Sequence, residues 1–227
     1  MLSMIQAVRY ICVENITRVL GKVFKKERPL MRCREIEIIE ELLKNLQPKN
    51  CLEWGAGYST TFFPRFLDKN AKWSSIEHDK RWYTKIEKMN KNHNSKVFYI
   101  PPNRSPRREQ YGDGSFTDFK DYIEFPKKFG RFDFILVDGR ARKHCLIKAH
   151  NLIKNKGIVV LHDANRKQYH GPFNLYKHQI LFKDYRKEGG GLWLGSKNLR
   201  IEQVLDVERH LEVWRQITKI GKIIRWV

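Results

Sequence analysis

Short apolar runs alternate with amphipathic stretches through the middle of the chain. Apolar runs of four to eight residues predict strands, and apolar positions three or four residues apart predict helices. The predicted strands are 50–54, 72–77, 96–100, 132–138 and 157–162. The predicted helices of this region are 34–46, 59–67, 80–90 and 143–153. Strands that alternate with helices pair in parallel through right-handed crossovers, so the pattern predicts an α/β fold with helices on both faces of the sheet.

The C-terminal third of the chain has a different pattern. Two further strands are predicted at 179–185 and 192–196, and the glycines at 189–191 between them suit an antiparallel hairpin at the sheet edge. The sheet is therefore expected to have seven strands and to be mostly parallel. Amphipathic basic helices are predicted at both termini, over 3–24 and 199–226. The expected division is an N-terminal helix (1–30), an α/β domain (31–198) and a C-terminal helix (199–227).

The chain carries a large excess of positive charge. Its 45 Lys and Arg residues against 25 Asp and Glu residues give a formal net charge of +20. Such a surface attracts nucleic acid, phosphorylated substrates or anionic lipid. An ordinary solvated basic surface explains the composition equally well. The charge alone identifies no partner.

The cysteines and the apolar segments indicate the compartment. Cys12, Cys33, Cys51 and Cys145 have no spacing typical of a zinc site or a disulfide framework, so a reduced, cytoplasmic environment is expected. No apolar run approaches the roughly 20 residues that span a bilayer. Three interpretations of the basic terminal helices stay open: peripheral contact with the inner membrane surface, packing on the sheet, or contact with a second copy in a homo-oligomer.

A glycine turn follows the first strand and opens a helix. Gly55 and Gly57 allow a tight turn and close approach of a ligand, and the helix that starts near Ser59 presents unpaired N–H groups. Glu77 ends the second strand, 22 residues after Gly55. An acidic residue at that position accepts hydrogen bonds from ribose hydroxyls in nucleotide-binding βαβ units. The turn and the carboxylate together predict a nucleoside-binding site.

Ionisable residues gather after the fourth and fifth strands. They are Asp138, Arg140, Arg142, His162, Asp163, Asn165 and Arg166. Ligands bind outside the carboxyl ends of the strands in open α/β sheets, so these side chains are expected to border a substrate. The three arginines would bind a carboxylate or phosphate of the substrate, or else form a solvated basic rim.

Two chemistries fit the acidic members of this group. Asp138, Asp163 and Asn165 offer the oxygen ligands that Mg²⁺ prefers, although Ala164 separates the last two. Without a metal, His162 is the best candidate for a general base, and Asp138 and Asp163 are further catalytic candidates. A structural role for His162 at the end of its strand is the alternative.

These motifs resemble those of class I S-adenosylmethionine-dependent methyltransferases, within an uncharacterised bacterial-type subgroup. The motifs are Glu53-x-Gly55-x-Gly57-x-Ser59, Ser-Ile-Glu77-His-Asp, Val137-Asp138-Gly139 and Leu161-His162-Asp163, and the likeness covers roughly 34–198. The resemblance implies a Rossmann-like fold with S-adenosylmethionine as cofactor. It implies that Glu53 and the 55–57 backbone hold the amino-acid end of the cofactor and that Glu77 binds its ribose. Asp113 or Ser115, at the end of the long loop 101–113, would reach the adenine, and Ser59 and Asp138 complete the predicted cofactor-binding set.

The predicted function is an S-adenosylmethionine-dependent methyltransferase, acting on oxygen in a small or glycan-like anionic acceptor, with Mg²⁺ as a candidate second cofactor. The first alternative is an RNA-binding protein or RNA methyltransferase with the same core. The second is a membrane-associated protein without catalysis. A dinucleotide-dependent redox enzyme is disfavoured, because Thr60 stands where the third glycine of that motif is expected.

Overall fold

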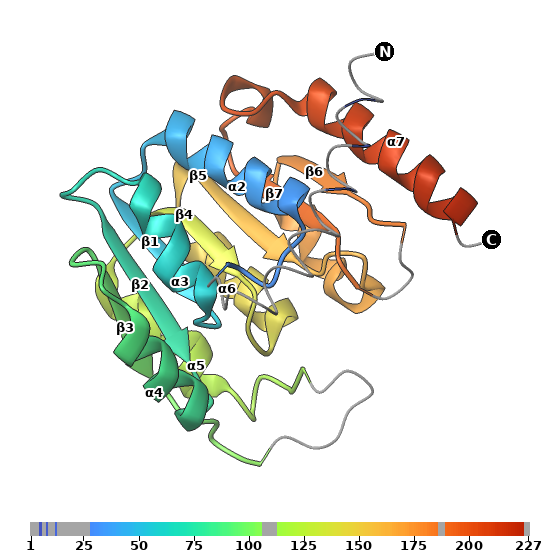
Figure 1. The fold of residues 1–227 in the computed structure, drawn as a ribbon. Coiled ribbons are helices and arrows are strands. Elements are labelled where there is room, and N and C mark those ends of the chain that lie inside the picture. Colours follow the sequence, from blue (N-terminus) through green and yellow to red (C-terminus); the bar gives the residue numbers. More distant parts are fainter. Residues whose placement is uncertain are drawn as a thin grey trace.

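The computed structural model describes residues 28–105, 113–185 and 189–224, with side chains up to residue 220, and three isolated positions before residue 28. The described chain forms a seven-stranded sheet in the order β3-β2-β1-β4-β5-β7-β6, with helices on both faces (Figure 1). The strands are β1 (Asn50–Trp54), β2 (Lys72–Glu77), β3 (Ser95–Tyr99), β4 (Phe132–Val137), β5 (Ile153–His162), β6 (His178–Phe182) and β7 (Leu192–Ser196).

Helices of two kinds connect these strands. The α-helices are α2 (Cys33–Leu46), α3 (Tyr58–Phe62), α4 (Lys80–Met89), α5 (Lys120–Glu124), α6 (Arg142–Leu152) and α7 (Val207–Ile224). Short 3₁₀ helices are η1 (Phe63–Phe66), η2 (Phe125–Phe129), η3 (Lys167–Tyr169), η4 (Gly171–Leu175) and η5 (Ile201–Gln203).

The strand pairing confirms the predicted Rossmann-like architecture. β1 pairs in parallel with β2 and β4, β2 pairs with β3, and β4 pairs with β5. β7 lies between β5 and β6 and runs antiparallel to both, which confirms the predicted antiparallel edge. From β1 the chain winds outward in both directions, first to β3 and then to β5. The connections therefore diverge beyond the carboxyl ends of β1 and β4, where ligands bind in folds of this kind.

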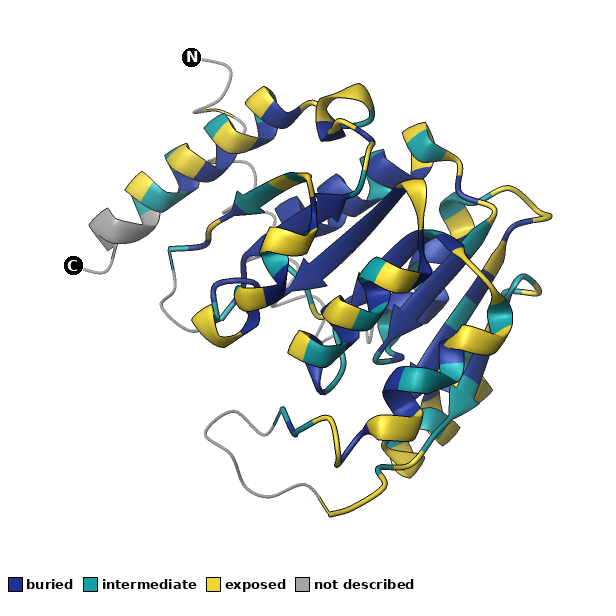
Figure 2. Ribbon diagram, turned by 180° about the vertical axis from the view of Figure 1, so that it is seen from behind, coloured by how far each residue is buried: buried dark blue, intermediate teal, exposed yellow. Residues whose placement is uncertain are grey.

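Alternate residues of each strand supply two separate apolar cores. In β1, Cys51 packs with α2, whereas Leu52 and Trp54 pack on the opposite face with α5 and α6. The central strands are buried almost throughout, and the helices expose only their outward sides (Figure 2). Because both faces are covered, β4 and the second half of β5 need apolar residues at nearly every position.

Proline explains one difference between the predicted and observed helices. The helix predicted over 59–67 is divided into α3 and η1, with Pro64 in the first turn of η1. Pro has no N–H to donate to the preceding turn, so a regular α-helix does not continue through it. α5 and η2, in the stretch before β4, were not predicted, and β5 begins at Ile153 instead of residue 157.

The C-terminal helix begins later than predicted and packs on the sheet. α7 starts at Val207 instead of residue 199, and Val207, Trp214 and Ile217 are buried. Leu211 is 36% exposed. Up to residue 220, the apolar side of α7 that carries Val207, Trp214 and Ile217 is thus covered by the chain itself. The predicted N-terminal helix lies almost wholly outside the described residues, and the three-part division of the chain stays a prediction.

Within the described part of the chain, no helix has both the length and the apolar character needed to cross a membrane.

Gly55→Ala is expected to destabilise the fold through a backbone clash. Gly55 has φ +95°, and a Cβ there would lie 2.4 Å from Cα of Gly139. Gly130 has a similar φ of +82° with open space around it, so Gly130→Ala measures the cost of the backbone conformation alone, about 1–3 kcal/mol. Urea denaturation should show a clearly larger loss for Gly55→Ala. Equal losses of unfolding free energy in Gly55→Ala and Gly130→Ala would contradict a clash between residue 55 and Gly139.

Candidate functional site

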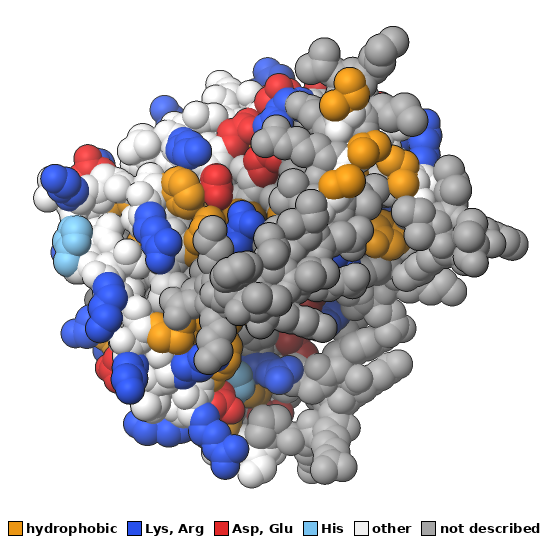
Figure 3. Space-filling model, viewed as in Figure 1, with side chains coloured by type: hydrophobic (Ala, Val, Ile, Leu, Met, Phe, Trp, Pro, Cys, Tyr) orange, Lys and Arg blue, Asp and Glu red, His pale blue; other side chains and the backbone are white. Residues whose placement is uncertain are grey.

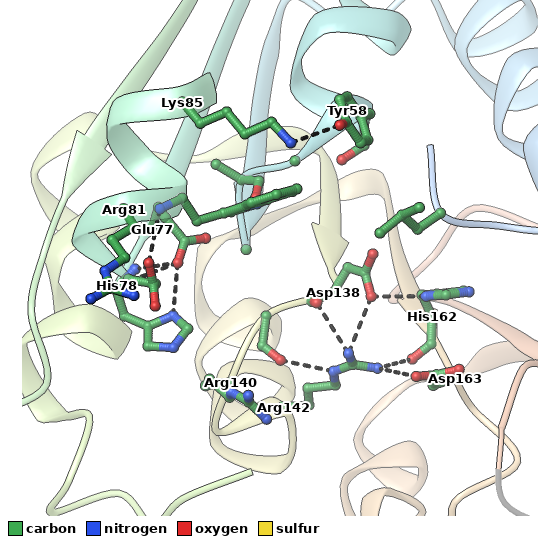
Figure 4. A pocket seen from close by; sticks show the side chains of 18 of the residues that line it. Tyr58, Glu77, His78, Arg81, Lys85, Asp138, Arg140, Arg142, His162 and Asp163 are labelled. Atoms are coloured by element: carbon green, nitrogen blue, oxygen red, sulfur yellow. Dashed lines mark hydrogen bonds and ion pairs between the residues drawn. The ribbon is translucent and has the colours of Figure 1, made fainter. Parts of the chain in front are cut away.

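A cavity of about 700 Å³ opens at the carboxyl ends of β1, β2, β4 and β5. The residues that line it are Leu30, Gly55, Ala56, Gly57, Tyr58, Ser59, Glu77, His78, Asp79, Arg81, Trp82, Lys85, Asp138, Gly139, Arg140, Arg142, His162, Asp163 and Arg166. Figure 4 shows Glu77, His78 and Arg81 on one side of it and Asp138, His162 and Asp163 on the other. The two predicted clusters, after β2 and after β4 and β5, therefore share one cavity.

The glycine turn forms the wall between these two sides. Gly57 precedes the first residue of α3, and a Cβ added to Gly57 would meet nothing closer than Oγ of Ser59, at 3.5 Å. Nε1 of Trp82 donates a hydrogen bond of 2.5 Å to the carbonyl oxygen of Ala56. This bond ties the turn to α4. The chain itself therefore leaves room beside the backbone at Gly57.

Glu53 lies behind the turn and not on the cavity wall. Its side chain is fully buried, and its carboxylate accepts hydrogen bonds from Oγ1 of Thr60 (2.6 Å), Oγ of Ser75 (2.6 Å) and Nε1 of Trp73 (3.0 Å), and from the Ser59 hydroxyl. Burial raises the pKa of Glu53 although these four donors lower it. The resemblance implied contact with the cofactor, but the geometry gives Glu53 a structural role instead, because it holds the first turn of α3 against β1 and β2.

Glu77 is placed as predicted. It ends β2, lines the cavity and is 3% exposed. Its Oε1 accepts hydrogen bonds from the backbone N–H groups of His78 (2.9 Å) and Asp79 (2.7 Å). These bonds fix the orientation of the carboxylate. No described residue donates a hydrogen bond to Oε2, which leaves this oxygen for a ligand.

The structure does not bring Asp113 and Ser115 to the cavity, contrary to the predicted adenine contacts. Oδ2 of Asp113 accepts a hydrogen bond from the backbone N–H of Arg142 (3.1 Å), and its carbonyl oxygen accepts one from Ala141 (2.7 Å). Asp113 therefore caps the start of α6. Ser115 donates to Oδ2 of Asp118 (2.7 Å), which closes a tight turn before α5. Both residues have structural roles that the loop sequence did not reveal.

His162 lies between two carboxylates. Its Nδ1 is 2.8 Å from Oδ1 of Asp138, and its Nε2 is 3.3 Å from Oε2 of Glu35, a fully buried residue of α2. Burial alone would lower the pKa of His162, but the charges of Asp138 and Glu35 outweigh burial and raise it well above its ordinary value. Both ring nitrogens thus lie next to carboxylates of the chain itself. These contacts favour the structural alternative for His162 over the predicted role as general base.

The guanidinium of Arg142 lies between the ends of β4 and β5. It makes ion pairs with Asp138 (3.2 Å) and Asp163 (3.3 Å) and donates hydrogen bonds to three backbone carbonyl groups. Burial alone would lower the pKa of Arg142, but the two carboxylates outweigh burial and raise it. Because its donors are already used within the protein, Arg142 does not serve as the predicted substrate clamp.

The predicted Mg²⁺ ligands are not assembled. Nδ2 of Asn165 donates to the carbonyl oxygens of Asp184 (3.1 Å) and Gly189 (3.2 Å), and its Oδ1 accepts from the N–H of Asp184 (3.0 Å). The Asn165 amide is thus tied to the segment between β6 and β7 and does not line the cavity. Between Asp138 and Asp163 the space is taken by Arg142. Among the described residues, no group of three or more His, Cys, Asp or Glu side chains is arranged to hold a metal.

All three predicted substrate arginines line the cavity, and Arg140 and Arg166 differ in their surroundings. Arg166 makes an ion pair with Asp163 at 3.1 Å. Arg140 is partly exposed, and no described carboxylate forms an ion pair with it. Arg140 is therefore the arginine of this group best placed to meet a ligand.

The contribution of α4 to the cavity, and that of Tyr58 in α3, was not predicted. Nζ of Lys85 is 2.8 Å from the hydroxyl of Tyr58, and the ring of Tyr58 packs edge-on against Trp82. His78 and Arg81 line the wall beside Glu77. A usable signal was present, because α4 starts three residues after Glu77 and its first turns must lie at the same sheet edge. Nothing in the sequence pointed to Glu35.

Asp163→Asn is expected to remove a pH-dependent part of the stability. Burial alone would raise the pKa of Asp163, but His162 and Arg142 outweigh it and lower the pKa from 3.8 to about 2. A lowered pKa stabilises the fold above pH ~4, and this contribution is lost as the pH falls towards 2. At pH 7 the variant should lose about 2 kcal/mol of unfolding free energy, and the difference from wild type should shrink between pH 4 and 2.

Urea titrations at several pH values measure this difference. The exposed Asp68, which pairs with Lys49 at 3.2 Å, provides the control, and Asp68→Asn should change the stability little. A difference between wild type and Asp163→Asn that stays constant over this pH range would contradict the assignment of the lowered pKa to Asp163.

Comparison with solved structures finds the same fold. A proposed O-methyltransferase from Klebsiella pneumoniae aligns with 84% of this chain and 99% of its own, with a TM-score of 0.57 and 14% identity. The O-methyltransferase TomG from Streptomyces achromogenes, solved with S-adenosylmethionine, aligns over 86% and 89% with a TM-score of 0.53 and 14% identity. An O-methyltransferase from Bacillus cereus, solved with S-adenosylhomocysteine, aligns over 87% and 91% with a TM-score of 0.55 and 13% identity.

At these identities the comparisons establish the fold, a Rossmann-like sheet of the class I methyltransferase type. No protein-family model and no curated protein matches this sequence.

Proposed function

We propose that this chain is an S-adenosylmethionine-dependent methyltransferase. The observation that carries the proposal is the pairing of an open glycine turn after β1 with the oriented carboxylate of Glu77 after β2, on the wall of one cavity. The cavity of about 700 Å³ is large enough for a nucleoside with an amino-acid tail and part of an acceptor. Structural neighbours solved with S-adenosylmethionine or S-adenosylhomocysteine support the same proposal.

The chain's own residues fit this cofactor. Oε2 of Glu77 is open to the ribose hydroxyls, and the first residues of α3 offer backbone N–H groups to the carboxylate of the amino-acid end. The N–H of Gly57 itself donates to Oγ1 of Thr60 at 3.0 Å. Tyr58 and Trp82 provide aromatic surface beside the turn. S-adenosylmethionine supplies an activated methyl group on a sulfonium, so the protein has to align an acceptor and receive its proton.

Asp138 is the carboxylate placed to receive that proton. Its Oδ1 is engaged by His162 and Arg142, whereas no described residue donates a hydrogen bond to Oδ2. A general base has to lie within hydrogen-bond reach of the proton that it receives, and Asp138 lines the cavity in which the acceptor would bind. We therefore propose an acceptor hydroxyl that is held next to Oδ2 of Asp138.

An anionic acceptor also agrees with the charges at the mouth of the cavity. Arg140 lies beside Asp138, and Arg81 is an exposed residue of the opposite wall without a described ion pair. Lys and Arg side chains are spread over the lower left of the face shown in Figure 3, where α4 carries Lys80, Arg81, Lys85 and Lys88. We propose oxygen methylation of a small or glycan-like acceptor that carries a carboxylate or sulfate.

Binding of S-adenosylmethionine, measured by calorimetry, tests the proposed function. Glu77→Ala should weaken binding about 10- to 100-fold, because hydrogen bonds to a charged group contribute roughly 1.5–3 kcal/mol. Glu202→Ala, which changes an exposed acidic residue of η5, should bind as wild type does. If the folded wild-type protein binds neither S-adenosylmethionine nor S-adenosylhomocysteine, the proposal fails.

Matched acceptor pairs test the proposed acceptor class. Methyl transfer from labelled S-adenosylmethionine is compared for phenols and glycosides that differ only by a carboxylate or sulfate. Wild type should favour the anionic member, and Arg140→Ala should lose about tenfold of that preference while its affinity for S-adenosylmethionine stays unchanged. Equal use of the neutral member by wild type would contradict an anionic acceptor.

A further inference from the structure

The hydrogen bonds and ion pairs of the Arg142 guanidinium are all with oxygen atoms, and the centre of the Tyr169 ring lies 5.8 Å from its Cζ. Nε donates to the carbonyl oxygen of Gly139 at 2.9 Å. Nη1 donates to the carbonyl oxygen of His162 at 2.8 Å and lies 3.3 Å from Oδ2 of Asp163. Nη2 donates to the carbonyl oxygen of Asp138 at 3.1 Å and lies 3.2 Å from Oδ1 of the same residue. Five oxygen atoms therefore surround one positive group, and the side chain is only 10% exposed.

The five oxygens converge from two neighbouring strand ends. Asp138 and Gly139 follow β4, whereas His162 ends β5 and Asp163 follows it. Backbone carbonyl and carboxylate oxygens are the ligands that hard divalent cations such as Mg²⁺, Mn²⁺ and Ca²⁺ select. Without a cation, two carboxylates and three carbonyl dipoles would point at one buried spot. Uncompensated charge of this kind is strongly destabilising.

The backbone at this point is shaped around the guanidinium. Ala141 (φ +50°) and Asp163 (φ +58°) both adopt the left-handed conformation, which costs free energy for residues other than glycine. Ala141 lets α6 start at once, so that Arg142, its first residue, folds back over the end of β4. The conformation of Asp163 is fixed further by a hydrogen bond from the N–H of Gly190 to its Oδ1, at 2.7 Å.

We infer that Arg142 is a built-in cation that takes the place of a divalent metal between the ends of β4 and β5. In this role it is a positioning residue: it holds Asp138 and Asp163 at the cavity wall and makes the site independent of metal. Arg suits this position because it stays charged and presents five N–H donors in one plane. In this role Arg142 balances the charges of Asp138 and Asp163 whether or not methyl transfer takes place, so the inference goes beyond the proposed reaction.

The two carboxylate oxygens that face the guanidinium each have one further nitrogen neighbour. Arg166 is 3.1 Å from Oδ2 of Asp163, and Nδ1 of His162 is 2.8 Å from Oδ1 of Asp138. An ordinary structural ion pair would also stabilise the fold, so stability alone does not test the inference. The distinguishing property is a latent metal site whose central space the guanidinium of Arg142 fills.

Mn²⁺ binding to wild type and to Arg142→Ala tests the inference, because the substitution empties the space between the oxygens. Electron paramagnetic resonance measures free Mn²⁺, and thermal melting is followed with Mn²⁺ or with a chelator. Wild type should bind no stoichiometric Mn²⁺ at this site, and its melting temperature should not respond. Arg142→Ala should bind one Mn²⁺ per chain, in competition with Mg²⁺, and Mn²⁺ should raise its melting temperature by several degrees.

Arg140→Ala is the matched control. It removes one positive charge from the same wall but leaves the oxygens around Arg142 unchanged, so it should not acquire Mn²⁺. The double variant Arg142→Ala, Asp163→Asn should lose the acquired site. None of these measurements needs a methyl donor. Their outcome is therefore independent of whether the protein binds S-adenosylmethionine.

Each result decides for or against the inference. Stoichiometric Mn²⁺ binding by wild type that Asp138→Asn abolishes would overturn it. A folded Arg142→Ala variant that binds no Mn²⁺ would also overturn it. If the variant is unfolded in chelator, recovery of the folded state by Mn²⁺ would support the inference, and failure to recover would count against it.

Discussion

The site depends on one contact between two backbones. The turn after β1 and the turn after β4 meet at Gly55 and Gly139, where a Cβ on either residue would lie within 3 Å of the other turn. Side chains at this contact would force the two strand ends apart. Because the turns touch, the wall after β1 and β2 and the charged wall after β4 and β5 enclose one cavity instead of two surface grooves.

The charged wall is largely compensated within the protein. Asp138, Asp163 and Glu35 carry the negative charges, and His162 and Arg142 carry the positive ones. Burial alone would raise the pKa of Glu35, but His162 outweighs it and lowers that pKa, so the buried carboxylate stays ionised. Most groups with the chemistry of a catalyst therefore hold the strand ends and the first turn of α2 in position. The described groups without such partners, namely Oε2 of Glu77, Oδ2 of Asp138 and the side chain of Arg140, are the ones available to a ligand.

The sequence predicted the sheet well because its signals are local. Apolar runs locate the strands within a few residues, and the position of Glu77 at a strand end follows directly from the strand it terminates. Parallel strands joined by right-handed crossovers have their carboxyl ends at the same edge of the sheet. The glycine turn with Glu77 and the ionisable residues after β4 and β5 were therefore expected at that one edge. These inferences require only the residue types a few positions before and after each residue in the sequence.

The partners of buried polar groups were not predictable in the same way. His162 pairs with Glu35, and Asn165 with the segment before β7, across long stretches of sequence. A histidine or an arginine at a strand end has the same sequence signature whether it meets a substrate or a carboxylate of its own chain. For this reason the sequence did not show that His162, Arg142 and Asn165 have partners within the chain. Asp113 was misplaced because its role in capping α6 depends on where a long loop returns.

The hydrogen bonds of Glu53 have a consequence for how this sequence can diverge. Four side chains from α3 and β2 satisfy one buried carboxylate, so none of the five can be replaced alone without leaving an unpaired polar group. Among descendants of this chain, Glu53, Ser59, Thr60, Trp73 and Ser75 should therefore be inherited as a set or exchanged together. Covariation at these positions would reflect folding of the turn and would carry no information about the acceptor.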